Sequence, residues 1–265
     1  MSQIQFLSDL HLETPESYDI FEVIPSAPYL ALLGDIGCVK DSGYLEFITK
    51  QLSQFQIVFL LLGNHEPYHN NWSTAKKILQ NLQTRIQEER TDRTLGSFVF
   101  LDQTRFDISD HVTILGCTLF SNILPEQEDH VSFGLNDFYD IEDWTVSDHS
   151  ASHSSDLSWL NTQVTSISQL EPHRKILIFT HHSPTISSLA SDGAHTGSKI
   201  SSGFSSDLKD EICWKHENVK VWAFGHTHFN CDFEDEGNRK RVVTNQRGYY
   251  FRQAIGFDGL KTIEF

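Results

Sequence analysis

Five short apolar runs in this chain each end at residues that commonly bind metal ions, and this arrangement constrains the fold more than any other feature. Each run has four to six residues, a length that suits a buried β-strand. In an open α/β sheet, ligands bind just beyond the carboxyl ends of the strands. The sequence therefore predicts a sheet that gathers five polar segments on one rim: Asp9-Leu-His11, Gly34-Asp35, Gly63-Asn64-His65-Glu66, His181-His182 and Gly225-His226-Thr-His228.

Amphipathic segments and further apolar runs fill the spaces between these motifs. Apolar residues recur at helical spacing, which predicts helices, in residues 43–54, 73–89 and 156–170. Ser73 is placed to cap the second helix. A meander of successive strands is predicted by the runs at residues 98–101, 106–108 and 112–115. Apolar strands that alternate with helices indicate an α/β fold with a sheet covered on both faces.

Residues 121–155 interrupt this alternation. They have little periodicity and are rich in acidic residues, histidines and aromatic residues. A loop of this length in a compact domain is usually functional or disordered. We expect a single domain over residues 1–265, in which 121–155 forms a lid or a wall of the substrate cleft. A simple surface excursion is the alternative.

The composition excludes several classes of function. A formal net charge of −16 argues against non-specific binding of nucleic acid. No run reaches the roughly 18–20 apolar residues that span a bilayer, and the first residues lack the features of a signal peptide. The four scattered cysteines fit reduced thiols. We therefore expect a cytoplasmic protein with a small substrate, no membrane segment and no nucleic-acid partner; the sequence does not indicate its oligomeric state.

The five segments, taken in order, resemble the motifs of the calcineurin-like metallophosphoesterase superfamily, and the match runs from Asp9 to His228. The resemblance implies an α/β fold made of two facing mixed sheets in a sandwich, flanked by helices. It also implies hydrolysis of a small phosphodiester or phosphomonoester by a hydroxide that bridges two divalent ions. Manganese, iron and zinc all suit ligands of mixed nitrogen and oxygen type.

Carried over motif by motif, the resemblance also implies a role for each polar residue. The first ion would be held by Asp9, His11 and His228, the second by Asn64, His181 and His226, and Asp35 would bridge both, because a carboxylate has two oxygens to share. His65 would protonate the leaving oxygen or stabilise charge on the phosphoryl group.

Three further residues are candidates for contacts with the substrate. His182 competes with His181 as a ligand, and we favour His181 because the histidine that leaves the strand is the usual ligand in the family. Glu66 would orient His65 or pack behind it, or is simply an acid at the start of a loop. Arg247 suits bidentate contact with a phosphate, with an ordinary surface arginine as the alternative.

The second motif separates this chain from one branch of the superfamily. Calcineurin-type protein phosphatases carry Gly-Asp-x-x-Asp-Arg-Gly, whereas this chain has Gly34-Asp35-Ile-Gly-Cys38 and lacks the arginine that grips phosphate in those enzymes. The pattern is closer to the small-phosphoesterase branch, so a protein phosphatase is the less favoured reading. A non-catalytic scaffold that binds partners is the other alternative. Every expected position is filled, His65 included, which argues against it.

Overall fold

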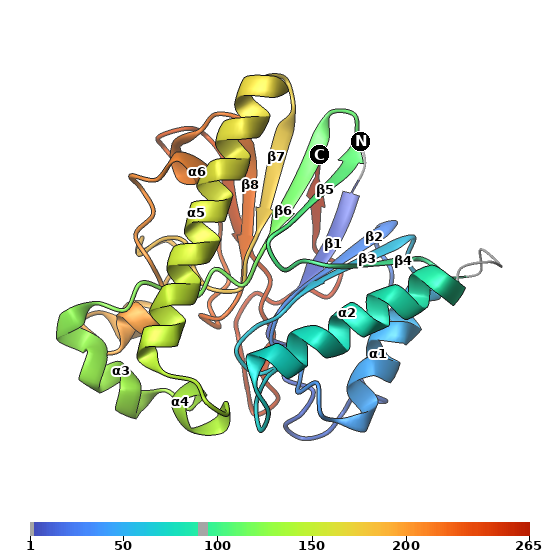
Figure 1. Ribbon diagram of the computed structural model, residues 1–265, viewed down its shortest axis with the longest axis horizontal. Coiled ribbons are helices and arrows are strands. Elements are labelled where there is room, and N and C mark those ends of the chain that lie inside the picture. The colour runs from blue at the N-terminus through green and yellow to red at the C-terminus, as the bar shows by residue number, and fades with distance from the viewer. Residues whose placement is uncertain (1–2, 90–94) are drawn as a thin grey trace.

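Two mixed β-sheets form the centre of the computed structural model, which describes residues 3–89 and 95–265 (Figure 1). The strand order of the first sheet is β13 (Thr262–Glu264), β1 (Gln3–Leu7), β2 (Tyr29–Leu33), β3 (Ile57–Leu61) and β4 (Ser97–Phe100). The order of the second is β5 (Thr104–Ser109), β6 (Val112–Gly116), β7 (Lys175–Phe179), β8 (Val219–Phe224), β10 (Arg241–Thr244) and β9 (Asp232–Glu234). A separate hairpin pairs β11 (Gly248–Tyr249) with β12 (Arg252–Gln253).

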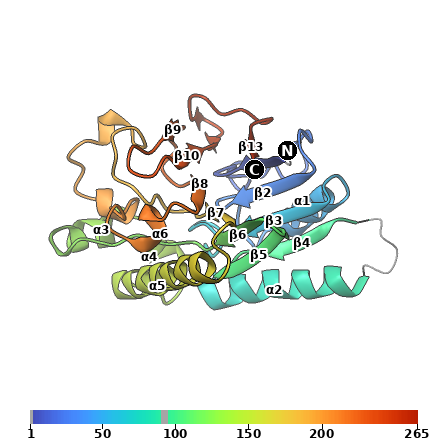
Figure 2. The same ribbon diagram turned by 90° about the horizontal axis from the view of Figure 1, so that it is seen from above.

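Parallel pairing dominates the interior of both sheets. Strands β1 to β4 run parallel to one another, as do β6, β7, β8 and β10. Antiparallel strands occur at the edges, where β13 pairs with β1, β5 with β6 and β9 with β10. Figure 2 shows the two ends of the chain close together, where β13 pairs with β1 at one edge of the first sheet. The parallel strands of each sheet therefore end together.

Three hydrophobic layers hold the sheets and helices together. The middle layer lies between the sheets and includes Phe6, Phe59 and Phe179, none of which is exposed. Helices α1 (Ser42–Leu52) and α2 (Trp72–Glu89) cover the first sheet, and α5 (Val146–Leu170) and α6 (Ile212–Lys215) cover the second (Figure 1). This arrangement confirms the expected two-sheet α/β sandwich. Within the described residues, no helix is long and apolar enough to cross a membrane.

Three local expectations were wrong. The strand at 98–101 does not begin a meander, because β4 pairs with β3 in the first sheet and the chain then crosses to the second at β5. Asn71, not Ser73, caps α2, since its side-chain oxygen accepts a hydrogen bond from the backbone N–H of Thr74. Helix α5 begins at Val146, ten residues before the expected start, and a capping box between Thr145 and Asp148 fixes its first turn.

Residues 121–155 are largely helical. They contain α3 (Glu128–Gly134), α4 (Asp137–Asp140) and the first turns of α5. His149 and His153 point inward from α5, with 1% and 4% of their surfaces exposed. Because these two buried residues are polar, the pattern of apolar residues did not reveal the first turns of α5.

Candidate dinuclear metal centre

The five polar segments meet at the carboxyl ends of β1, β2, β3, β7 and β8. Three of these strands belong to the first sheet and two to the second, so both sheets contribute to one site. Backbone hydrogen bonds connect the loops: the N–H of Asp9 donates to the carbonyl of Gly34, and the N–H of Gly225 donates to that of His181. The backbone N–H of His226 donates to Asp9 Oδ1 at 3.0 Å, which connects the loops of the second sheet to those of the first.

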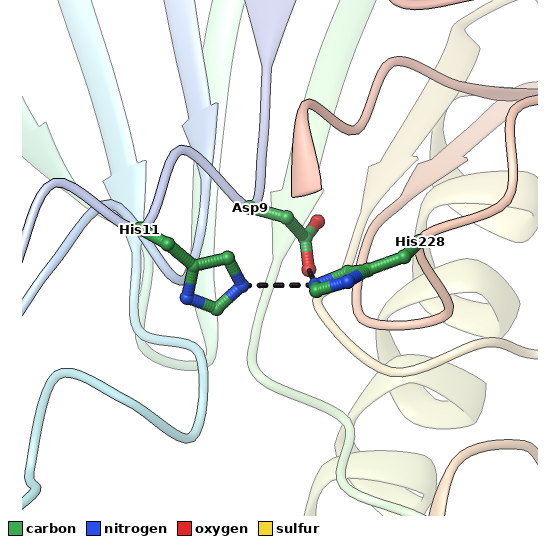
Figure 3. Close-up of side chains that lie close together, drawn as sticks. All are labelled: Asp9, His11 and His228. Carbon is green, nitrogen blue, oxygen red and sulfur yellow. Dashed lines mark hydrogen bonds and ion pairs between the residues drawn. The ribbon is translucent and has the colours of Figure 1, made fainter. Parts of the chain in front are cut away.

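Asp9, His11 and His228 form the first cluster of potential ligands (Figure 3). The Nε2 atoms of His11 and His228 lie 2.9 Å apart, and His228 Nε2 lies 3.4 Å from a carboxylate oxygen of Asp9. Burial alone would raise the pKa of Asp9, but its hydrogen bond with the His228 imidazole lowers it. The three side chains thus place two imidazole nitrogens and an ionised carboxylate around one point.

Asp35, His181 and His226 form the second cluster. His181 donates from Nδ1 to the carbonyl oxygen of Leu33, at 2.9 Å, which turns its Nε2 towards Asp35 Oδ2, at 3.4 Å, and Asn64 Oδ1, at 3.1 Å. Burial, followed by the charge of His181, lowers the pKa of His226 to about 3. His226 is therefore held as a neutral imidazole, the form that binds metals.

Asp35 lies between the two clusters. Its Oδ2 atom is 3.4 Å from His181 Nε2 and 3.9 Å from His11 Nε2. Its Oδ1 atom accepts a hydrogen bond from the backbone N–H of His65. Burial opposes ionisation of Asp35, but the neighbouring His181 and His65 hold its pKa well below the usual value. One carboxylate thus faces both sets of imidazoles.

The polar atoms of this site fit divalent metal ions. Within the described residues, the ion pairs of Asp9 and Asp35 are with histidines only. His226 Nε2 is buried and has no hydrogen-bond partner among these residues. The Nε2 atoms of His11 and His228 face each other, and each carries a lone pair when its hydrogen is on Nδ1. Buried carboxylates and lone pairs of this kind are satisfied by a cation of mixed nitrogen and oxygen coordination.

The backbone at the site is strained. Five of the clustered residues have positive φ angles that non-glycine residues rarely adopt: Asp9 at 52°, His11 at 48°, Asp35 at 53°, His226 at 71° and His228 at 50°. Such conformations cost of order 1–3 kcal/mol each and persist only where the surrounding structure enforces them. The strain turns successive side chains of one loop into the same small volume.

His65 lies at the edge of the clusters, with 9% of its surface exposed. Its Nε2 atom is 4.0 Å from Asp35 Oδ2 and 3.3 Å from the hydroxyl of Tyr249, and its ring stacks on Tyr68 at 4.2 Å between centroids. Burial would lower the pKa of His65, but the charges of Asp35 and Glu13 raise it to about 9. The ring is therefore held as a proton donor beside the shared carboxylate.

The three residues expected to touch the substrate contact other parts of the protein. Glu66 is fully buried, and its carboxylate accepts hydrogen bonds from the backbone N–H groups of Asp35, Ile36 and Gly63. His182 is also fully buried and packs against His226. Arg247 donates to the carbonyl oxygen of Leu10 and lies over the ring of Phe21. Glu66 and His182 therefore have no exposed surface in this structure, whereas Arg247 is partly exposed.

Four other residues at the site were missed from the sequence. Asp137 accepts hydrogen bonds from Asn64 Nδ2, at 2.8 Å, and from the Tyr68 hydroxyl, at 2.7 Å. This fixes the amide so that Asn64 Oδ1 faces the second cluster. Tyr249 stacks on His11 with 4.2 Å between centroids, and Glu13 bonds to His11 and His65. Only Glu13 had a local signal, because it follows His11 by two positions.

The chain is similar to several known proteins. A family model described as calcineurin-like phosphoesterase matches residues 3–230. An uncharacterized protein of Acanthamoeba polyphaga mimivirus is 27% identical, with 94% of this chain and 92% of the relative covered. Phosphopantetheinyl hydrolase from Mycobacterium tuberculosis has a similar fold, with a TM-score of 0.66, 13% identity and coverage of 94% of this chain and 90% of that one. A dimetal phosphatase from Danio rerio also has a similar fold, with a TM-score of 0.54, 14% identity and coverage of 94% of this chain and 88% of that one.

These similarities agree with the geometry of the site. The matched residues 3–230 contain all five strand-end segments. The ligand atoms within each of the two clusters lie within 4.8 Å of one another, as groups that hold metal ions do. The chain therefore belongs to the calcineurin-like phosphoesterase family and is a metal-dependent phosphoesterase.

Proposed function

We propose that this phosphoesterase hydrolyses small phosphodiesters or phosphomonoesters at a centre of two divalent ions. The position of Asp35, within 4.0 Å of His11 and His181 from different clusters, carries this proposal. The proposed ligands are Asp9, His11 and His228 for one ion, Asn64, His181 and His226 for the other, and Asp35 for both. Mn²⁺, Fe²⁺ and Zn²⁺ all suit this set.

The residues of the chain would divide the chemistry among them. Bound divalent ions acidify water and neutralise charge on phosphoryl oxygens. Asn64 contributes a neutral oxygen, so less ligand charge opposes the anionic ester at the second cluster. His65, beside Asp35 and outside both clusters, is placed to donate the proton from Nε2 to the leaving oxygen.

Residues 121–155 are proposed to form one wall of the substrate cleft. Asp137 of α4 contacts Asn64 directly, and the N–H of Glu142 donates to the carbonyl oxygen of Asn70, which follows the third motif. Phe133 and Tyr139 remain 78% and 65% exposed on this wall. Because residues 121–155 lie directly against the third motif, we infer that the cleft accepts a small substrate and not a folded protein.

The test is hydrolysis of p-nitrophenyl phosphate and bis-p-nitrophenyl phosphate by metal-stripped protein reloaded with Mn²⁺. Turnover should require metal, and Asp35→Asn should lose more than 100-fold in rate and bind less than two ions, because it removes the shared charge. The preferred ester separates monoesterase from diesterase action. Failure of the native protein to hydrolyse either ester with two ions bound would contradict the proposal and favour a partner-binding scaffold.

A further inference from the structure

Glu13 connects two histidines that have different roles in the proposed reaction. Its Oε1 atom accepts a hydrogen bond from His65 Nδ1 at 2.9 Å and another from His11 Nδ1 at 3.1 Å. The Glu13 side chain is 9% exposed, and its Oε2 atom is buried without a hydrogen-bond partner among the described residues. No lysine or arginine of the described residues pairs with it. Burying a carboxylate costs free energy unless it is paired. Among the described residues the two imidazoles are the partners of Glu13, which points to a role in the orientation of those rings.

We propose that Glu13 is a positioning residue that fixes the ring orientation of His65, with His11 as its second partner. The proposal rests on the phosphoesterase function proposed above. An ionised carboxylate only accepts hydrogen bonds, so each Nδ1 atom must carry the hydrogen. Both Nε2 atoms are thereby directed into the site, where that of His11 presents a lone pair and that of His65 faces Asp35.

The orientation matters for one step of the reaction. As the ester P–O bond breaks, its electron pair passes to the leaving oxygen, which takes the proton from His65 Nε2. Water supplies the new oxygen on phosphorus, and the proton released from that water returns through solvent to His65. A ring flip about the Cβ–Cγ bond would replace Nε2 by a carbon atom and stop the proton transfer. Stacking on Tyr68 limits tilting of the ring but does not distinguish the two flipped states.

Two competing explanations make different predictions. The ligand atoms of His11, Glu13 and His65 also lie within 4.8 Å of one another, so a metal ligand is one alternative role for Glu13. It could also simply brace its loop. Ligand loss would reduce the number of ions bound, and a bracing role would slow all substrates equally. A positioning role affects chiefly those esters whose leaving oxygen needs a proton.

The kinetic test compares phenyl and p-nitrophenyl esters of the class that the native enzyme prefers. Glu13→Ala should lower kcat about 10–100-fold for the phenyl ester, as is typical when a supporting carboxylate is removed. The p-nitrophenyl ester, with its stable leaving group, should lose far less, and KM should change little. The Glu13→Ala/His65→Ala protein should be no slower than His65→Ala, because the first residue acts through the second. Glu13→Gln, which keeps one acceptor oxygen, should recover part of the rate.

The control is Glu16→Ala, which removes an exposed acid three residues along the same loop. It should leave both rates unchanged. Equal losses on both esters after Glu13→Ala, additive effects in the double variant, or a bound ion missing at saturating Mn²⁺ by elemental analysis would each overturn the proposal.

A second measurement does not depend on activity. ¹⁵N NMR of metal-free protein with labelled histidines should show protonated Nδ1 atoms for His11 and His65. Glu13→Ala should move the ¹⁵N signal of His65 Nδ1, because that atom loses its hydrogen-bond acceptor, and Glu16→Ala should not. An unchanged Nδ1 signal would contradict the role of Glu13 even in a protein that hydrolyses neither ester, so this result is separable from failure of the proposed function.

Discussion

At the scale of single residues, the site is defined by backbone conformation as much as by side-chain chemistry. The left-handed conformations of Asp9, His11 and Asp35 turn these side chains towards a common centre. Glycines in the motifs make room for that geometry. A Cβ atom on Gly225 would lie 2.6 Å from Asp9 Oδ2, and one on Gly63 would lie 2.2 Å from Asp35 Oδ1. These glycines are therefore needed for space beside the carboxylates.

A substitution at Gly225 tests this explanation. Gly225→Ala should displace the Asp9 carboxylate and weaken Mn²⁺ binding at the first cluster about 10–100-fold, while the far-ultraviolet circular dichroism spectrum stays native. Calorimetric titration of metal-free protein gives the affinity. Gly193→Ala is the matched control, because nothing lies within 4 Å of its new Cβ atom. Native-like Mn²⁺ binding by Gly225→Ala would contradict the steric argument.

Residue patterns in the sequence gave the motifs but not the contacts behind them. Asp9 and Asp35 were identified because each closely follows an apolar strand, and His11 because it lies two residues after Asp9. Both signals are local in the sequence. The hydrogen bond of Asn64 with Asp137 joins positions 73 residues apart. No local pattern contains such a contact, because it arises only when the helices of 121–155 pack against the third motif.

At the scale of elements, α5 holds the crossover loop after β6 in place. Asp156 of α5 accepts hydrogen bonds from the backbone N–H of Leu119 and from Gln103 Nε2, both at 2.8 Å. Leu119 and Phe120 have positive φ angles of 70° and 52°. The buried carboxylate thus anchors a strained loop that leads towards the site.

The pH dependence of stability should report this anchor. Burial raises the pKa of Asp156 to about 6 from a model-peptide value of 3.8. The folded state therefore binds more protons than the unfolded state between these pH values, and its stability falls as the pH rises through that window. The loss is at most about 3 kcal/mol, from about 2 pKa units.

Asp156→Asn cannot ionise, which isolates the contribution of this group. Its free energy of unfolding should increase relative to that of the native protein, by up to about 3 kcal/mol between pH 4 and pH 7, so the variant gains relative stability as the pH rises. Urea unfolding of metal-free proteins at both pH values measures the difference. The lost hydrogen bond lowers stability equally at each pH, so a pH-independent difference would show that Asp156 titrates normally.

The elements themselves were predictable to different degrees. Buried parallel strands are continuous apolar runs, so the strands before Gly34-Asp35 and Gly63-Asn64, which are β2 and β3, were identified from the sequence. The pairing of β4 was not, because a strand that joins one sheet and a strand that begins the next have the same local pattern. The early start of α5 was hidden because buried His149 and His153 occupy its inner face.

At the scale of the whole molecule, the site joins the two sheets. Asp9, Asp35 and Asn64 follow strands of the first sheet, whereas His181 and His226 follow strands of the second. An ion bound by residues from both sheets binds the folded state and not the unfolded chain. Metal binding and the cohesion of the sandwich should therefore be coupled.

Thermal unfolding with increasing Mn²⁺ should show this coupling. At a free concentration 100 times Kd, one site adds about 2.7 kcal/mol, which corresponds to a rise of about 5–10 °C in Tm for a chain of this size. Asp35→Asn should show a much smaller rise, because it removes the carboxylate that we propose both ions share. A rise of equal size in the two proteins would place the bound Mn²⁺ outside the proposed centre.

The contact of Asp137 with Asn64 has a consequence for how such an enzyme can change its substrate. Segment 121–155 resembles an exchangeable module. Its replacement could change substrate specificity while the five strand-end segments stay the same. Here the module also supports a proposed ligand. If 121–155 is the proposed wall, a transplanted segment that lacks an acid at position 137 should alter selectivity and metal loading together, so new specificities should arise mainly in sequences that keep this carboxylate.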